Sequence, residues 1–110
     1  MKRTALIVAL ACIAAQAHAD TDTDFTRARA IAGEHACLGC HAVDKKLVGP
    51  AYRDVAARYS GQSNAVALLV KHVQQGSAGV WGNVPMPPNR IDAVDARLVV
   101  NWVLAGAPDH

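Results

Sequence analysis

A cysteine pair and a histidine stand together in the stretch Cys37-Leu38-Gly39-Cys40-His41. Thiols at this spacing suit three kinds of chemistry: a redox-active disulfide, part of a zinc site, or the covalent attachment of haem. A zinc site needs four ligands, whereas this stretch offers three at most and no second cysteine pair follows it. The zinc interpretation is therefore the weakest of the three.

The dithiol and haem interpretations differ in what they require of the rest of the chain. A thioredoxin-like Cys-x-x-Cys opens a helix within a βαβ unit, and this chain shows no such alternation of elements. Haem attachment uses all three side chains, because the two thiols form thioethers with the vinyl groups and the adjacent histidine then binds the iron. The motif therefore predicts a covalently bound haem with His41 as an axial ligand.

The second axial position of such an iron has four candidates, which are Met86, His35, His72 and His110. His35 lies too close to the motif to reach the opposite face, and His110 is the last residue. Met86 has prolines on both sides, which keep the loop extended and remove backbone donors around the thioether. A lone methionine is more often core filling, but the prolines and the loop favour Met86 as the ligand.

Two protein ligands on the iron predict electron transfer and no enzymatic activity. A thioether ligand favours ferrous iron and raises the reduction potential. Two other interpretations stay open. One is a secreted thiol–disulfide oxidoreductase that uses Cys37, and the other is a haem-based ligand-binding protein or peroxidase with a displaceable sixth ligand.

The first residues read as a targeting segment rather than as part of the fold. Lys2 and Arg3 precede an apolar run at 5–15 that is too short to span a bilayer, and Ala17-His18-Ala19 resembles a cleavage site. We expect a cleaved signal peptide at 1–19, a mature domain at 20–110 and export to an oxidising compartment. Cys12 sits in a poor lipobox, so cleavage without lipidation is the favoured prediction.

The composition of residues 20–110 limits the possible partners. Without the targeting segment, nine basic residues balance nine acidic ones, so no basic face for nucleic acid is indicated. No membrane span is expected either. The 91 remaining residues suffice for one domain, and we expect a monomer. A covalently held porphyrin would give such a thin core a large apolar disc to pack against.

The hydrophobic pattern predicts an all-α domain. No stretch alternates with a period of two, whereas four stretches suit helices: 26–36, 51–59, a third between Ser63 as N-cap and Gly76 as stop, and a fourth that starts at Asp92 and ends near Gly106. Residues 77–90 hold three prolines and two glycines, so we expect a long loop without regular structure there.

The segments CLGCHAVDKKLVGPAYRDVAARYSGQ, VWGNVPMPPN and NWVL resemble class I cytochromes c, specifically the small bacterial cytochrome c-551 (c8) type. The resemblance implies a four-helix domain wrapped around one haem c. It also implies that Cys37 and Cys40 attach the haem and that His41 and Met86 bind its iron. In the family, the Pro50 carbonyl would accept a hydrogen bond from His41 Nδ1–H, and the Trp81 indole N–H would donate to a haem propionate. Asn89 would support the Met86 sulfur, and Trp102 would pack the last helix on the first.

Two positions depart from the family pattern. Position 32 is Ala where the family often has a bulky aromatic residue, so we expect the first and last helices to meet differently. Position 72 is His where many members have Arg, and a contact from His72 to a propionate is an expectation with a solvent-facing histidine as its alternative.

The resemblance also implies a place in metabolism. It points to a periplasmic single-electron carrier between respiratory or denitrification complexes. The implied partners are nitrite reductases, terminal oxidases, peroxidases and a cytochrome bc1-type donor. Docking would use the apolar surface around the haem edge, with Lys45 and Lys46 at its rim.

Overall fold

The fold comes from a computed structural model, which describes residues 21–109. In this part of the chain the α-helices are 21–34, α2 (Tyr52–Tyr59), α3 (Ala65–Gln75) and α4 (Ala93–Leu104), with a short 3-10 turn, η1 (Cys37–Gly39). Residues 21–109 contain no strand, only an isolated antiparallel bridge between Ser77 and Met86. The predicted all-α fold is confirmed. The predicted signal peptide, Cys12 and His110 lie outside the described residues.

The ends of α4 and α3 follow partly from their capping residues. The Asp92 carboxylate accepts a hydrogen bond from the backbone N–H of Asp95 at 2.8 Å, which satisfies a free donor in the first turn of α4. Gly76 ends α3 with a φ of 78°, a conformation that suits glycine. The prediction of Ser63 as N-cap was wrong. The Ala65 N–H instead donates to the Gln62 carbonyl, which closes a turn before the helix, so α3 starts at Ala65.

The first helix differs from its predicted range of 26–36 at both ends. It already includes residue 21, and the Thr26 hydroxyl donates to the Asp22 carbonyl within it. It stops at residue 34 because Ala36 adopts a left-handed conformation with a φ of 57°. This break turns the chain into η1, so the cysteine motif leaves the helix instead of extending it.

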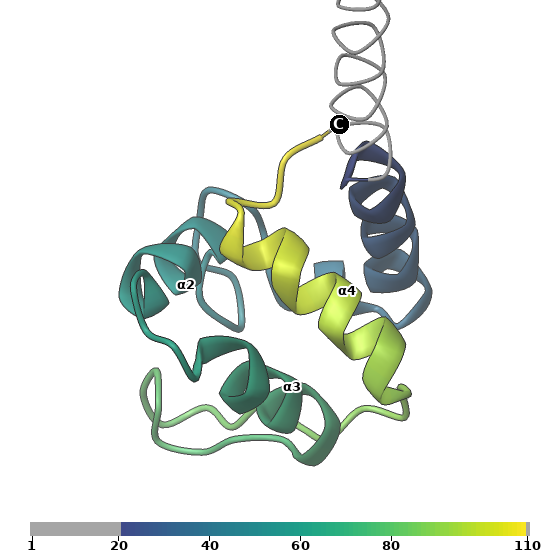
Figure 1. Cartoon of the computed structure of the whole chain (residues 1–110). Coiled ribbons are helices and arrows are strands. Elements are labelled where there is room, and N and C mark those ends of the chain that lie inside the picture. The colour runs from purple at the N-terminus through teal and green to yellow at the C-terminus, as the bar shows by residue number, and fades with distance from the viewer. Residues whose placement is uncertain (1–20, 110) are drawn as a thin grey trace, which may run out of the picture.

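Helix α4 forms the centre of the core. It packs against both α2 and α3, and helix 21–34 crosses it on another side (Figure 1). Ala28 and Ala32 of the first helix are fully buried and Ile31 is nearly so, so this helix meets the core through two alanines and one isoleucine. Trp102 of α4 lies in the same buried cluster, and its ring makes an edge-to-face contact with Tyr52 of α2 at 5.6 Å.

Polar contacts also join the first helix to the C-terminal region. Arg27 forms an ion pair with Asp95 at 3.4 Å, and Arg29 donates to the Asp109 carbonyl. The Arg27 side chain is largely exposed, so its pair contributes little stability. The Trp102 indole donates to the Pro108 carbonyl at 2.8 Å, which binds the C-terminal segment back against the core.

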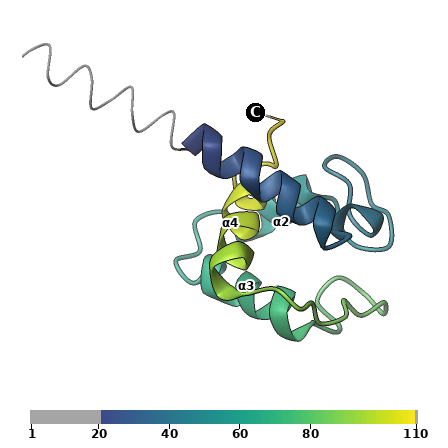
Figure 2. The same cartoon turned by 90° about the vertical axis from the view of Figure 1, so that its right-hand side faces the viewer.

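Two loops gather at one end of this helical arrangement. The chain between η1 and α2 and the chain between α3 and α4 face each other across an opening on the right of Figure 2. The first loop carries the cysteine motif and the second carries Met86. The fold thus brings together two segments that are about 45 positions apart in the sequence.

Candidate haem site

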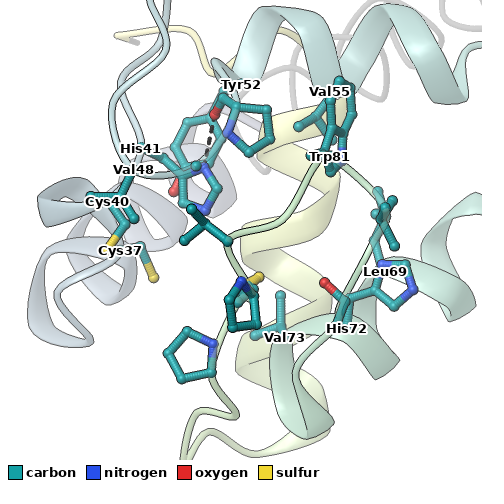
Figure 3. Close-up of a pocket in the computed structure, with 18 of the residues that line it drawn as sticks. Cys37, Cys40, His41, Val48, Tyr52, Val55, Leu69, His72, Val73 and Trp81 are labelled. Carbon is teal, nitrogen blue, oxygen red and sulfur yellow. Dashed lines mark hydrogen bonds between the residues drawn. The ribbon is translucent and has the colours of Figure 1, made fainter.

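A cavity of about 630 Å³ lies between these two loops. Its size is typical of pockets that enclose a cofactor or another small molecule. Figure 3 shows Cys37, Cys40 and His41 on one side and Leu69, His72 and Trp81 on the other. Its walls come from the first loop, α2, α3, the second loop and α4, and include Val55, Leu69, Val73, Val99, Val100 and Val103.

The cysteine motif forms one compact turn on the cavity wall. The carbonyl of Cys37 accepts hydrogen bonds from the N–H groups of Cys40 and His41 at 3.1 and 3.0 Å. Both thiols are free, and both residues line the cavity. The turn therefore presents two thiols and an imidazole to the same space, the donor set that a doubly attached haem requires.

The imidazole of His41 is held by its Nδ1 atom. The Pro50 carbonyl lies 2.8 Å from Nδ1, and because a carbonyl only accepts, Nδ1 carries the proton. The contact implied by the family resemblance is thus present. It leaves the lone pair on Nε2, which is the arrangement of a neutral histidine that binds a metal.

Two further residues, which sequence reasoning missed, fix the plane of this imidazole. The Tyr52 ring stacks on it with centroids 5.0 Å apart and an interplanar angle of 19°. At Gly49, an added Cβ would lie 2.4 Å from His41 Cε1, so only glycine fits there. The sequence showed Gly49-Pro50 as a helix start and gave no sign of this close approach.

Backbone hydrogen bonds fold the segment after the motif against α2. The Gly49 N–H donates to the Cys40 carbonyl at 2.7 Å. The N–H groups of Tyr52 and Arg53 donate to the carbonyls of Ala42 and Val43, both at 2.9 Å. These bonds hold the Pro50 carbonyl at the imidazole.

Met86 is held through its own backbone. Its N–H and C=O pair with Ser77 at 2.9 and 3.0 Å, which forms the isolated bridge. This bridge was not expected, since the prolines and glycines of 77–90 argued against regular pairing. An added Cβ at Gly76 would lie 2.6 Å from the Met86 carbonyl oxygen, so glycine is needed beside the bridge. Met86 lines the same cavity as His41.

Asn89 anchors the far end of the Met86 loop. Its backbone N–H and its side-chain amide both donate to the Val73 carbonyl, at 3.0 and 3.1 Å. The side-chain amide also lies 3.3 Å from the Pro87 carbonyl. The structure thus gives Asn89 a role in tying the loop to α3, and its support of the Met86 sulfur stays a prediction.

Trp81 and His72 line the cavity on the side opposite the motif (Figure 3). The pKa of His72 is lowered, first by burial and then by the neighbouring charge of Lys71. Trp81 is partly exposed and lies under the guanidinium of Arg58, whose Cζ is 4.5 Å from the ring centroid. Sequence reasoning missed Arg58, because no local pattern links it to a tryptophan 23 positions later.

The protonation of the groups near the motif argues against a dithiol enzyme. Burial raises the pKa of Cys37, which keeps its sulfur in the thiol form. Reactive cysteines of oxidoreductases instead have a lowered pKa, because the thiolate is the nucleophile. Burial also raises the pKa of Tyr52, so its ring stacks on His41 as a neutral phenol.

These observations fit a haem. The cavity is lined mainly by apolar side chains, the thiols and the imidazole share one wall, and the close approaches at Gly49 and Gly76 shape the segments that carry His41 and Met86. Cys37, Cys40, His41 and Met86 are the residues that could hold the group.

Comparison with known proteins agrees with this geometry. The sequence profile of the Cytochrome c family matches residues 25–106. Cytochrome c-551 of Pseudomonas aeruginosa is 51% identical over 69 residues, which is 63% of this chain and 66% of that protein. Cytochrome c-552 of Nitrosomonas europaea is 39% identical over 93 residues, 84% of this chain and 82% of that protein.

The fold comparison gives the same result. The crystal structure of wild-type cytochrome c552 from Nitrosomonas europaea superposes with a TM-score of 0.68 and 40% identity, and covers 70% of this chain and 96% of that one. The family profile, the c-551 and c-552 relatives and this structure all match the region that holds most of the described helices. The chain therefore belongs to the cytochrome c family, as a small class I member that transfers electrons through a covalently bound haem c.

Proposed function

We propose that this protein is a periplasmic one-electron carrier in which Cys37 and Cys40 attach the haem and His41 and Met86 bind its iron. When bound, the haem supplies a reversible one-electron ferric/ferrous couple. The remaining task of the chain is to hold both ligands still, to exclude water and to present one edge of the cavity to a partner. None of these tasks requires a substrate to reach the metal.

The observation that carries this proposal is that His41 and Met86 line one cavity from two separately anchored loops. The Pro50 carbonyl, the Tyr52 ring and the Gly49 backbone fix the imidazole, while the Ser77 bridge fixes the backbone of Met86. Ligands that are already in place before the electron arrives favour electron transfer over ligand exchange. A thioether ligand also favours the ferrous state.

The mouth of the cavity supports a docking role. Leu38, Leu47, Val48, Trp81 and Val84 are exposed apolar residues, and all but Leu38 line the cavity itself. An apolar mouth suits the brief, small interfaces of redox partners. Lys45 and Lys46 are exposed in the first loop and extend this surface. Nitrite reductases, terminal oxidases, peroxidases and a cytochrome bc1-type donor are the partner classes we propose, with the carrier acting as a monomer.

The location rests on the targeting segment at 1–19, with the mature domain at 20–110. In residues 21–109 the structure contains no helix with the length and apolar character of a membrane span. Mass spectrometry of the exported protein tests the proposal, because cleavage before Asp20 and the added mass of one haem are both measurable. A mature protein that retains residues 1–19 would contradict this part.

The cofactor arrangement is tested by acid-acetone extraction and by the oxidised spectrum. We expect the colour to stay with the protein, no free thiol to be titrated, and the sulfur-to-iron charge-transfer band to be present. A colourless protein that titrates two thiols would instead support the oxidoreductase. A coloured protein without the band would support a ligand-binding haem protein.

A further inference from the structure

Arg58, in the last turn of α2, holds the edge of the cavity formed by Trp81. Its Nη1 donates to the Val80 carbonyl at 2.7 Å, and its Cζ lies 4.5 Å from the centre of the Trp81 ring. A guanidinium at this distance is attracted by the indole, and its planar shape stacks better than an ammonium group. One exposed side chain thus fastens two consecutive residues of the second loop to α2.

A basic residue at the end of a helix also has a purely structural role, since it opposes the negative end of the helix dipole. Two contacts show that Arg58 does more. Its guanidinium stays 5.8 Å from the Tyr59 ring of its own helix and contacts the second loop, although Asp54 lies four residues earlier at ion-pair spacing. Both ion pairs found in residues 21–109 involve other residues, so no carboxylate of this part neutralises Arg58.

His72 does not supply a permanent charge to the cavity side that carries Trp81. Figure 3 shows His72 on the same side of the cavity as Trp81. Burial, and then the charge of Lys71, lower the pKa of this imidazole, so it is mainly uncharged at neutral pH. An arginine does not lose its proton in this range. Arg58 therefore carries the permanent positive charge that contacts Trp81.

We propose that Arg58 is a positioning residue for the haem: it holds the Trp81 indole so that its N–H binds a propionate carboxylate, and it brings a fixed positive charge to that carboxylate. The proposal rests on the function given above, because it assumes a haem ligated by His41 and Met86. A positive charge near the haem disfavours the more positive ferric state. Arg58 therefore raises the reduction potential.

The test compares the potential of Arg58→Gln with that of Arg53→Gln at one pH and one ionic strength. Arg53 is a matched control, because it is also an exposed arginine of α2 and also donates to a backbone carbonyl, that of Asp44 at 3.0 Å. Both changes remove one positive charge. We expect a clearly larger fall in potential for Arg58→Gln, and equal falls in the two variants would overturn the proposal.

A second pair of variants separates positioning from charge alone. In a Trp81→Phe background, we expect the fall caused by Arg58→Gln to shrink but to stay larger than that of Arg53→Gln, because the positioning role acts through the indole whereas the charge of Arg58 does not. A fall that persists in full would overturn the positioning role. Arg58→Lys keeps the charge but loses the planar contact, so we expect an intermediate potential and altered near-ultraviolet circular dichroism of Trp81.

If Arg58→Gln does not fold, the potential and the dichroism of Arg58→Lys still test the role of Arg58. A lysine variant with native potential and native dichroism would overturn the positioning role. The charge-transfer band of each variant separates this proposal from the one on which it rests. A native band with an unchanged potential refutes only the role of Arg58, whereas absence of the band in the unaltered protein refutes the Met86 ligation.

Discussion

The two loops that face each other across the cavity are held in different ways. The loop after the cysteine motif is anchored along its length. The Gly49 N–H bonds back to Cys40, the first N–H groups of α2 bond to Ala42 and Val43, and the Pro50 carbonyl binds His41. The loop with Met86 is anchored at its two ends, by the Ser77 bridge and by Asn89, and between them, in the described part of the chain, only by the side chain of Arg58 at Val80 and Trp81. Between these ends, the backbone of 78–85 makes no hydrogen bond to another backbone group within residues 21–109.

This difference indicates which of the two proposed iron ligands is held more firmly. His41 is enclosed by the Pro50 carbonyl, by the stacked Tyr52 ring and by Gly49, which nothing larger can replace. Met86 is held by the short Ser77 bridge and lies in a loop that few other contacts hold and whose Val84 is 64% exposed. Segments with few buried contacts open first. We therefore expect Met86 to leave the iron before His41 when the protein is stressed.

The largest expected effect comes from removing the ligand on the weaker side. Met86→Ala should abolish the sulfur-to-iron charge-transfer band and open the iron to water or added imidazole. The potential should fall by a sizeable part of the roughly 0.8 V range that axial ligands span. Spectroelectrochemistry measures both changes. An unchanged band would show that Met86 is not the ligand and would favour the haem-based ligand-binding protein or peroxidase.

The next effect tests the rigidity of the His41 side. Gly49→Ala places a Cβ 2.4 Å from the imidazole, so we expect a loss of about 1–3 kcal/mol in the free energy of unfolding. Denaturant unfolding of the holoprotein measures it. Gly33→Ala is the control, because a Cβ there meets nothing within 4 Å and alanine favours a helix. If both variants unfold alike, the imidazole is not tightly enclosed.

A smaller effect should come from loosening the Met86 loop. Asn89→Ala removes the amide bonds to Val73 and Pro87, a loss of about 1 kcal/mol in holding the loop closed. Added imidazole should then displace Met86 at roughly five- to tenfold lower concentration. Gln74→Ala is the matched control, since its amide donates to the Ile91 carbonyl, which follows the Asn89 anchor. Equal imidazole affinities in the two variants would contradict a weakly held Met86 loop.

The smallest effect is a pH dependence that involves His72. Reduction makes the haem more negative, which raises the pKa of a nearby imidazole, and by linkage protonation raises the potential. The potential should therefore fall as pH rises through the His72 titration. Because burial and then Lys71 lower this pKa, we expect the fall at a pH below the ordinary pKa of histidine. His72→Gln and His72→Arg should both remove this contribution, and three coinciding curves of potential against pH would refute it.

Much of the helical frame was predictable, because its signals are local. Asp92 and Gly76 act within one turn of their own helices, and their roles were visible in the sequence. The start of α3 was not, since Ser63 and Asn64 are both good caps and the turn closed by Ala65 on Gln62 decides between them. The left-handed Ala36 was equally hidden, because alanine usually favours the helix that it ends here.

The candidate site likewise contains residues that a local motif predicts and contacts that only the fold brings about. Cys37, Cys40 and His41 form one short motif, so their shared chemistry could be predicted without a fold. The contact between Arg58 and Trp81 joins α2 to a loop beyond α3, and the approach of Gly49 to His41 depends on how a loop folds back. Such contacts between separate segments leave no periodic or local trace in the sequence.

The packing of helix 21–34 on α4 also sets an order of events along the chain. Arg27 and Asp95 are 68 positions apart, and Arg29 and Asp109 are 80 apart, so the core closes only after the C-terminal part has been made. The cysteine motif directly follows the first helix and emerges long before its packing partner. While the chain is being made, both thiols therefore stay accessible, because α4 and the segment around Pro108 are the last parts available to close the core.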